Sequence, residues 1–258
     1  MGIEHLFSLQ GKVALVTGDS RGIGFMIARG FLDAGARVYI SARKERACEK
    51  AAAELSGFGD CTAIPADVSS VEGADHLLEE VRGREPELHV LVNNAGTSWG
   101  ASLDEYPDFA WAKVWDVNVK GIFHLTRGFL PELKAAAAPD DPARVINIGS
   151  IDGLRVPTFE NYAYAASKAG VHMLTRQLAH RLRADNITVN AIAPGLFHSR
   201  MTDFFLKDNA EAASSFIPLG RIGRDDDMAG AAIYLASRAG SYLTGAVIPV
   251  DGGVSTHG

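Results

Sequence analysis

The sequence predicts an α/β fold in one domain, with a doubly wound, seven-stranded parallel sheet and helices on both faces. Three observations lead to this fold class. Short runs of β-branched residues alternate with longer helical stretches along the whole chain. Most of the short runs are apolar throughout, as is typical of strands covered by helices on both sides. No linker, low-complexity run or fixed-period repeat interrupts the pattern, so residues 1–258 are expected to form a single domain.

Seven segments carry the strand pattern, and stretches long enough for crossover helices lie between them. In chain order the expected strands are Lys12–Val16, Arg37–Ile40, Thr62–Ala66, His89–Val92, Arg144–Ile148, Thr188–Ile192 and Ala246–Val250. The stretch after the fifth strand shows a helical period, because apolar residues recur there every three or four positions. These residues are Val171, Leu174, Leu178 and Leu182, and they predict one buried stripe. Strands alternating with helices in this way favour a doubly wound sheet.

One segment, His198–Pro218, departs from the regular alternation. It follows the sixth strand directly and has no clear period. Its large apolar residues are Met201, Phe204, Phe205, Leu206 and Phe216. A segment of this length after a strand is typical of a substrate lid, and a helical hairpin packed on the domain is the alternative.

Charge and composition exclude several classes of protein. The chain has 25 Lys and Arg against 31 Asp and Glu, a net charge of −6, so the basic patches of a nucleic-acid-binding protein are not expected. No apolar run approaches the roughly 18 residues of a membrane span, and the start of the chain lacks the pattern of a secretory signal. Cys48 and Cys61 have no paired spacing, so neither a disulfide framework nor a metal site is expected. We therefore expect a cytoplasmic protein whose partner is a small molecule, with no membrane and no nucleic acid.

The first strand leads into a glycine-rich turn, in which Thr17–Gly24 read TGDSRGIG. Gly18 permits a tight turn, Gly22 lets a pyrophosphate approach the backbone, and Gly24 allows the helix to pack closely on the strand. The N-terminus of the following helix offers free N–H groups and a positive dipole end to phosphates. At this place in the sheet the turn predicts a dinucleotide-binding Rossmann fold rather than a plain loop. The residues of the turn expected to bind the cofactor are Gly18, Ser20, Arg21, Gly22, Ile23 and Gly24.

The end of the second strand favours NADP(H) over NAD(H). Ala42 stands where an acidic residue would bind a free ribose 2′-hydroxyl, and Arg43 follows it. A guanidinium can grip a 2′-phosphate with two hydrogen bonds. Ser20 and Arg21 could reach the same phosphate. The alternative is that these arginines are solvated surface charges.

Tyr164 and Lys168 lie one helical turn apart, on the same face of the expected helix. A free tyrosine has a pKa of about 10, which is too high for efficient proton transfer at neutral pH. A neighbouring cation favours the phenolate, so we expect Lys168 to lower the pKa of Tyr164. Tyr162 lacks such a partner, because Ala166 stands four residues after it.

Five motifs appear in a fixed order along the chain: the glycine-rich turn, Asn93–Gly96 (NNAG), Ser150, the Tyr164/Lys168 pair, and Pro194 with Gly195. In this order they resemble the short-chain dehydrogenase/reductase family over essentially the whole chain. The resemblance implies that Tyr164 is the general acid that protonates the carbonyl oxygen during hydride transfer. It implies that Lys168 holds the nicotinamide ribose, that Ser150 donates a hydrogen bond to the substrate oxygen, and that Asn118 anchors a proton-relay water.

The same resemblance implies further cofactor contacts. Asp67 and Val68 match the adenine pocket, and residues 94–96 line the cofactor. Pro194, Gly195 and Phe197 would flank the nicotinamide, and Ser199 stands where the family often has Thr. With Tyr164 and Lys168 the implied contacts are Asp67, Val68, Asn94, Ala95, Gly96, Pro194, Gly195, Phe197 and Ser199. Asn118 could instead cap a helix, and Asp67 could instead stabilise a turn. Trp99, which follows the NNAG motif, is expected in a wall of the pocket, and ordinary core packing is the alternative.

Within the family, the segments SLQGKVALVTG, NNAGTSWGA and ARVINIGS and the Ile217–Gly253 tail are most similar to bacterial β-ketoacyl reductases of the rhamnolipid-pathway type. This resemblance implies NADPH-dependent reduction of a 3-oxoacyl thioester, or a similar ketone, to the alcohol. Reductases that act on acyl carrier protein place a basic residue 21 positions after the catalytic Tyr, and here that residue is Asp185. Because like charges repel, an acidic carrier protein is disfavoured as a partner, and a CoA thioester or a free ketone is favoured.

Two other functions remain open at this point. A sugar or polyol dehydrogenase would use the same scaffold. A non-catalytic NADP-binding sensor would be expected to lack the acid or its cation, whereas Ser150, Tyr164 and Lys168 are all present. Leu243–Gly245 and Asp251–Gly253 resemble the tail through which the family forms tetramers, so a homotetramer is expected by resemblance.

Overall fold

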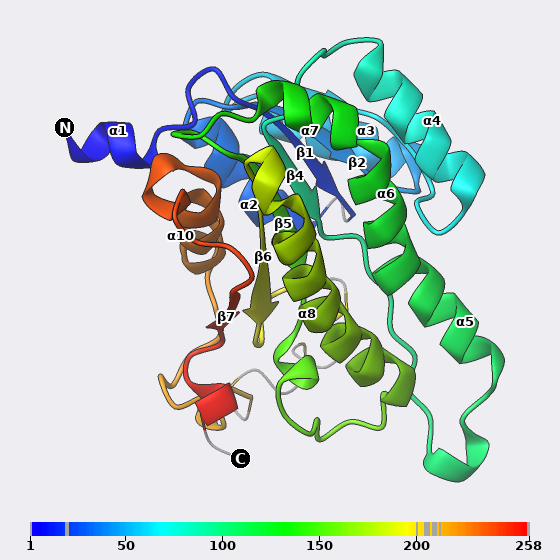
Figure 1. Cartoon of the computed structure of the whole chain (residues 1–258). Coiled ribbons are helices and arrows are strands. Elements are labelled where there is room, and N and C mark those ends of the chain that lie inside the picture. Colours follow the sequence, from blue (N-terminus) through cyan, green and yellow to red (C-terminus); the bar gives the residue numbers. More distant parts are fainter. Residues whose placement is uncertain are drawn as a thin grey trace.

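The sheet seen in the computed structural model has seven parallel strands in the order β3-β2-β1-β4-β5-β6-β7 (Figure 1). The structure describes residues 2–18, 21–199, 201–203, 207, 211 and 213–256. The strands are β1 Val13–Thr17, β2 Arg37–Ser41, β3 Cys61–Ala63, β4 Val90–Asn93, β5 Ala143–Ile148, β6 Ile187–Pro194 and β7 Val247–Val250. All seven predicted strands are therefore confirmed, with bounds shifted by one to three residues. The predicted fold class is confirmed as well.

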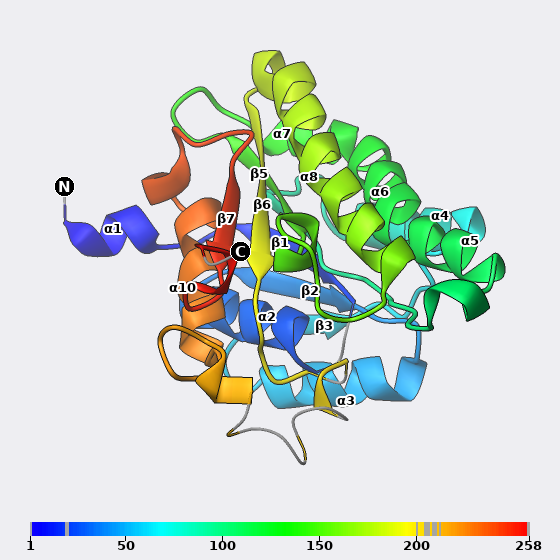
Figure 2. The ribbon, with the colours of Figure 1, turned by 90° about the horizontal axis from the view of Figure 1, so that it is seen from below.

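Helices cover both faces of the sheet (Figure 2). On one face lie α2, α3 and α10, which share an apolar core with β1, β2 and β4. On the other face α4, α6, α7 and α8 enclose a second core. The helices are α1 Ile3–Phe7, α2 Ile23–Asp33, α3 Glu45–Leu55, α4 Val71–Arg82, α5 Phe109–Trp115, α6 Ile122–Gly128, α7 Leu130–Ala136, α8 Tyr162–Leu182 and α10 Asp225–Ala236. Shorter helical turns are η1 Leu103–Glu105, η2 Asp116–Gly121, η3 Ile151–Gly153, η4 Arg183–Asp185, η5 Arg238–Gly240 and η6 Val254–Thr256.

The predicted stripe on α8 is only partly correct. Val171 and Leu182 are buried, but Leu174 and Leu178 are only half-buried. The face that packs on the sheet consists of small and polar residues, namely Ala163, Ser167, Lys168, Val171, His172, Thr175, Ala179 and Leu182. Ser167, Lys168 and Thr175 can be buried because they find partners in the core. Thr175 Oγ1, for example, accepts a hydrogen bond from Asn147 Nδ2 at 2.9 Å.

The carboxyl ends of the four central strands all lie at one edge of the sheet. The glycine-rich turn follows β1 there, and the NNAG motif includes the end of β4 and the residues after it. Ser150 follows β5, and Pro194 closes β6 at the same edge. In open α/β sheets this edge is the one that binds ligands. Within the described residues, no helix is long and apolar enough to cross a membrane.

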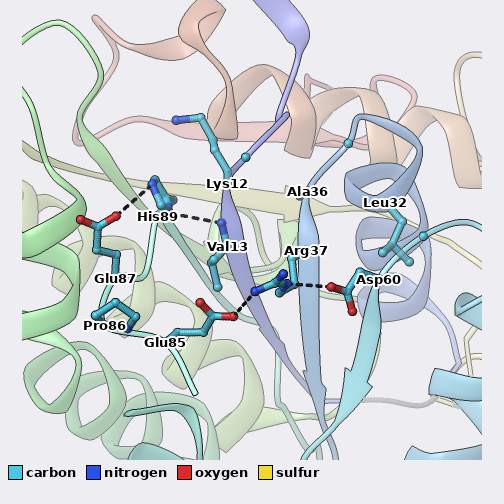
Figure 3. A pocket seen from close by; sticks show the side chains of 13 residues that line it. Lys12, Val13, Leu32, Ala36, Arg37, Asp60, Glu85, Pro86, Glu87 and His89 are labelled. Atoms are coloured by element: carbon cyan, nitrogen blue, oxygen red, sulfur yellow. Dashed lines mark hydrogen bonds and ion pairs between the residues drawn. The ribbon is translucent and has the colours of Figure 1, made fainter. Parts of the chain in front are cut away.

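A cavity of about 500 Å³ lies at the opposite edge, beside the starts of β1, β2 and β4 (Figure 3). Its lining contains none of the predicted site residues. Arg37 crosses it, donating hydrogen bonds to Asp60 at 2.7 Å and to the buried Glu85 at 2.8 Å. The Tyr39 hydroxyl donates to the same Glu85 oxygen at 2.8 Å, and burial with this carboxylate raises the pKa of Tyr39 to about 12. The ion-pair chain ties the beginning of β2 to the segments before β3 and β4.

Replacing Glu85 with Ala should therefore destabilise the fold. The change leaves the Tyr39 hydroxyl and one Arg37 N–H without an acceptor, which should lower the free energy of unfolding by about 1–3 kcal/mol. Urea unfolding measures this difference. Glu87→Ala is the matched control, because among the described residues its half-exposed carboxylate has one ion-pair contact, a long one of 3.9 Å with His89. Equal losses in the two variants would contradict the structural role of Glu85.

Candidate active site

Ser150, Tyr164 and Lys168 come together at the carboxyl edge of the sheet. Ser150 follows β5, and the other two residues lie on consecutive turns of α8. The Lys168 Nζ donates a hydrogen bond to the Ile148 carbonyl at 2.7 Å and lies 5.5 Å from the centre of the Tyr164 ring. The Ser150 hydroxyl faces the Tyr164 phenol, close enough to lower its pKa. The structure thus assembles the three residues that the sequence predicted as acid, cation and hydrogen-bond donor.

Burial changes the pKa values of Tyr164 and Lys168 in opposite directions, because it disfavours the charged form of each. It raises the pKa of Tyr164 to about 12, against the effect of the hydrogen bond with Ser150. It lowers the pKa of Lys168 to about 8. The expected net lowering of the Tyr164 pKa is therefore not found in the protein alone, where burial is the largest effect on the phenol. The ammonium faces the Ile148 carbonyl and the phenol ring, and desolvation dominates at both groups.

Asn118 is fully buried in the π-helical turn η2, between α5 and α6. Its Oδ1 accepts a hydrogen bond from Thr97 N at 2.8 Å, and its Nδ2 donates to Thr97 O and to Ser167 Oγ at 3.0 and 2.9 Å. The alternative that Asn118 caps a helix is therefore wrong. Its side chain links the segment after β4 to α8, with both amide N–H groups used. The predicted water relay stays a prediction.

The glycine-rich turn is closely packed against the end of β4. Gly18 has φ of 78°, and a side chain there would collide with the backbone of Ala95. Asn94 Nδ2 donates to the Thr17 and Gly18 carbonyls at 2.9 and 3.1 Å. The Asn94 side chain thus braces the turn, and the N–H groups of Asn94 and Ala95 donate to Thr17 Oγ1, so a cofactor contact of residues 94–96 stays a prediction. Of the other predicted turn residues, Arg21 is exposed and Ser20 lies outside the described residues.

Gly22 makes the second close approach in this turn. Its φ is 82°, and a Cβ atom there would lie 2.8 Å from the Cβ of Ser199. Ile23 then begins α2, and Gly24 packs against Asn94, as expected for a helix held close to the sheet. The segment after β6 therefore touches the glycine-rich turn.

Arg43 and Asp67 face each other beside this turn. Arg43 follows β2 and is 70% exposed, with its Nη1 3.9 Å from Asp67 Oδ2. Asp67 Oδ1 also accepts hydrogen bonds from the N and Oγ of Ser69 at 3.1 and 2.6 Å. The alternative that Asp67 stabilises a turn is thus confirmed. An adenine contact by Asp67 and the buried Val68 stays a prediction.

Among the residues after β6, Phe197 differs from the expectation that it flanks the nicotinamide. The Phe197 ring is buried and packs on Gly223, so only its backbone is left to contact a cofactor. Gly195 lies against the backbone of Asp251, next to Pro194. Ser199 Oγ is 3.1 Å from Thr202 Oγ1, which donates to the Phe197 carbonyl at 2.6 Å. Both hydroxyls thus lie together at the place where Ser199 is expected to contact the cofactor, and that contact stays a prediction.

Only part of the predicted lid, His198–Pro218, lies within the described residues. Met201 and Phe216 are described and exposed, whereas Phe204, Phe205 and Leu206 lie outside the described residues. The lid therefore stays a prediction.

Tyr106 is a site residue that the sequence did not reveal. Its hydroxyl accepts a hydrogen bond from Ala163 N at 3.2 Å and donates one to the Trp99 carbonyl at 3.3 Å. It thus satisfies an N–H group in the first turn of α8, directly before Tyr164. Trp99 itself is half-buried and packs edge-on against the exposed Phe109, with ring centres 5.0 Å apart, so it is not part of the core, and its place in a pocket wall stays a prediction. No local pattern signals the contact of Tyr106 with Ala163, because the two residues lie 57 positions apart.

Comparisons with known proteins agree with this geometry. A family model described as enoyl-(acyl carrier protein) reductase matches residues 18–255. The rhamnolipids biosynthesis 3-oxoacyl-[acyl-carrier-protein] reductase of Pseudomonas aeruginosa is 53% identical, over 96% of this chain and 97% of its own. A galactitol 2-dehydrogenase (L-tagatose-forming) of Cereibacter sphaeroides is 37% identical over 98% of each chain. Among solved structures, the Pseudomonas aeruginosa RhlG/NADP active-site complex is similar with a TM-score of 0.95 and 51% identity, covering 97% of this chain and 99% of that one.

Proposed function

The chain belongs to the short-chain dehydrogenase/reductase family, and from this premise we propose that it uses NADPH to reduce the keto group of a 3-oxoacyl thioester to a secondary alcohol. The observation that carries the proposal is the group of buried Ser150, half-buried Tyr164 and buried Lys168, in which the phenol keeps its proton at neutral pH. A ketone reduction needs an acid in this state. The relative that is 53% identical is a 3-oxoacyl reductase by name, which supports the thioester as substrate.

The residues at the carboxyl edge fit NADP(H). The backbone at Gly18 and Gly22 bends with positive φ around the end of β1, and the exposed Arg43 suits a 2′-phosphate. We expect the glycine-rich turn, residues 94–96 and Lys168 to hold the cofactor, next to Pro194 and Gly195. When bound, NADPH supplies the hydride.

The protein's own residues carry the proton. Tyr164 donates its phenolic proton to the carbonyl oxygen of the substrate. The Ser150 Oγ accepts a hydrogen bond from Asp152 N at 3.1 Å, so its own proton is available for the same substrate oxygen. The Lys168 ammonium then stabilises the phenolate left on Tyr164. The backbone carbonyl of Asn118 would hold the water that returns a proton.

Apolar side chains around the site support an acyl substrate over a polyol. Leu154 and Val156, in the loop that follows Ser150, are exposed, the latter by 86%. Phe216 and Leu219, in the segment after β6, are exposed as well. Leu219 N donates to the Gly252 carbonyl at 3.1 Å, next to the Asp251 that packs on Gly195, so this segment lies beside the catalytic edge. Exposed apolar side chains at a catalytic edge suit a hydrocarbon chain better than a sugar.

Asp185 indicates which molecule carries the acyl group of the substrate. Its Oδ1 is 3.1 Å from the Nζ of Lys134, so the lysine is paired and a carboxylate stands where carrier-protein reductases have a cation. We therefore favour a CoA thioester over an acyl carrier protein.

We further propose a cytoplasmic homotetramer. The family-like tail and the exposed Trp111 of α5 and Phe123 of α6 support the assembly.

Tyr164→Phe tests the proposed reaction with acetoacetyl-CoA and NADPH as substrates. The variant should lose a factor of about 10²–10⁴ in kcat, because the general acid is gone. NADPH binding, measured by fluorescence titration, should change little. Tyr162→Phe is the matched control, since that hydroxyl contacts only the exposed Glu160 carboxylate within the described structure. Full activity of Tyr164→Phe would contradict the mechanism, and wild-type activity confined to sugars or polyols would contradict the acyl substrate.

Arg43→Ala tests the choice of cofactor. If the guanidinium binds the 2′-phosphate, the variant should bind NADPH about tenfold more weakly, as expected for the loss of about 1.4 kcal/mol of binding free energy. Its affinity for NADH should stay the same. Arg29→Ala, on α2, removes an exposed arginine that pairs with Asp33 and serves as the control. An unchanged ratio of the two affinities in Arg43→Ala would exclude Arg43 as the phosphate-binding residue.

A further inference from the structure

His172 is a buried histidine on the catalytic face of α8 that the proposed mechanism does not use. Tyr164, Lys168 and His172 follow one another at intervals of four residues, so they lie on one face of the helix. His172 is only 3% exposed. Neither ring nitrogen has a hydrogen bond of good geometry to another protein group in the described structure, although the Gly153 backbone lies close enough to act on the ring as an acceptor.

The His172 ring lies against the loop that carries Ser150. A side chain at Gly149 would collide with the ring at Nε2, and a Cβ atom at Gly153 would lie 2.9 Å from the ring Cε1. Ser150 stands between these two glycines. The loop is also held at Gly149, whose N–H donates to the Ile192 carbonyl of β6 at 2.7 Å. The imidazole therefore fills the space beneath the loop on both sides of the Ser150 backbone.

The surroundings keep this ring neutral. Burial lowers the pKa of His172 to about 4, and Lys168 and Arg176 on the same helix add to the shift. The Gly153 backbone, which faces the ring from η3, opposes it. A neutral imidazole whose nitrogens have no protein partner of good geometry is a costly filler, because buried polar atoms destabilise a fold unless they are well hydrogen-bonded. An apolar side chain would fill the same space at less cost, so filling space does not explain a histidine here.

We infer that His172 is a positioning residue for carbonyl reduction. Its flat ring fixes the Gly149–Gly153 loop so that the Ser150 hydroxyl faces the Tyr164 phenol and the substrate oxygen. Lys168 holds the same loop one turn earlier, through the Ile148 carbonyl. The inference rests on the proposed reductase function, because Ser150 matters through its contact with a reacting carbonyl.

A double-mutant cycle between His172 and Ser150 tests this role. In the wild-type background, His172→Ala should lower kcat about tenfold, because a small displacement of a catalytic group costs that much or more. In the Ser150→Ala background the same change should cause little further loss, because His172 acts through Ser150. NADPH affinity should stay unchanged in all four proteins. His172→Leu repeats the cycle with most of the side-chain volume kept, in case the alanine variant does not fold.

Met173→Ala is the matched control, because Met173 is the next residue of α8 and is 61% exposed. An unchanged kcat in His172→Ala and His172→Leu would overturn the inference. So would equal fold-losses in the two Ser150 backgrounds, which would indicate a merely structural role. The cycle uses whichever carbonyl compound the wild type reduces. If the wild type does not reduce 3-oxoacyl thioesters, that result counts against the proposed substrate. If the losses of kcat caused by the His172 and Ser150 substitutions are additive, that result counts against the role of His172 alone.

Discussion

The catalytic edge depends on one buried hydrogen bond, from the Lys168 ammonium to the Ile148 carbonyl at 2.7 Å. This contact joins the middle of the sheet to α8 at the point where β5 ends. It fixes the position of α8 along its axis relative to β5. Tyr164 one turn before Lys168 therefore meets Ser150, and His172 one turn after it lies beneath the Ser150 loop. An ammonium can be held there because its charge is shared with a carbonyl and faces the Tyr164 ring.

The same burial sets the protonation states of Tyr164 and Lys168. It raises the pKa of Tyr164 to about 12 and lowers the pKa of Lys168 to about 8. At neutral pH the protein therefore holds a protonated phenol beside an ammonium, which is the state required to donate a proton to a carbonyl. Oxidation of an alcohol would need the phenolate instead. The protein thus presents the protonated phenol that reduction of a ketone requires.

The strands and the catalytic residues could be predicted because their signals are local. β-branched runs mark the seven strands, and the glycine-rich turn and the Tyr164/Lys168 spacing mark the site. Contacts between distant segments could not be predicted, as the hydrogen bond between Tyr106 and Ala163 illustrates. The pKa of Tyr164 depends on depth of burial, which spacing does not reveal. The packed face of α8 was only partly predicted, because Thr175 and Ser167 are buried through hydrogen bonds from Asn147 and Asn118 rather than through apolarity.

The most direct test of this account is an absorbance titration of the Tyr164 phenol in the cofactor-free protein. Tyrosinate absorbs in the near ultraviolet, and subtracting the titration of Tyr164→Phe from that of the wild type isolates one tyrosine. With the pKa of Tyr164 raised to about 12, the difference should show no tyrosinate at pH values up to about 10, where a free tyrosine is half ionised. A tyrosinate signal that appears near neutral pH would contradict the account, because Tyr164 would then be a base before the cofactor binds.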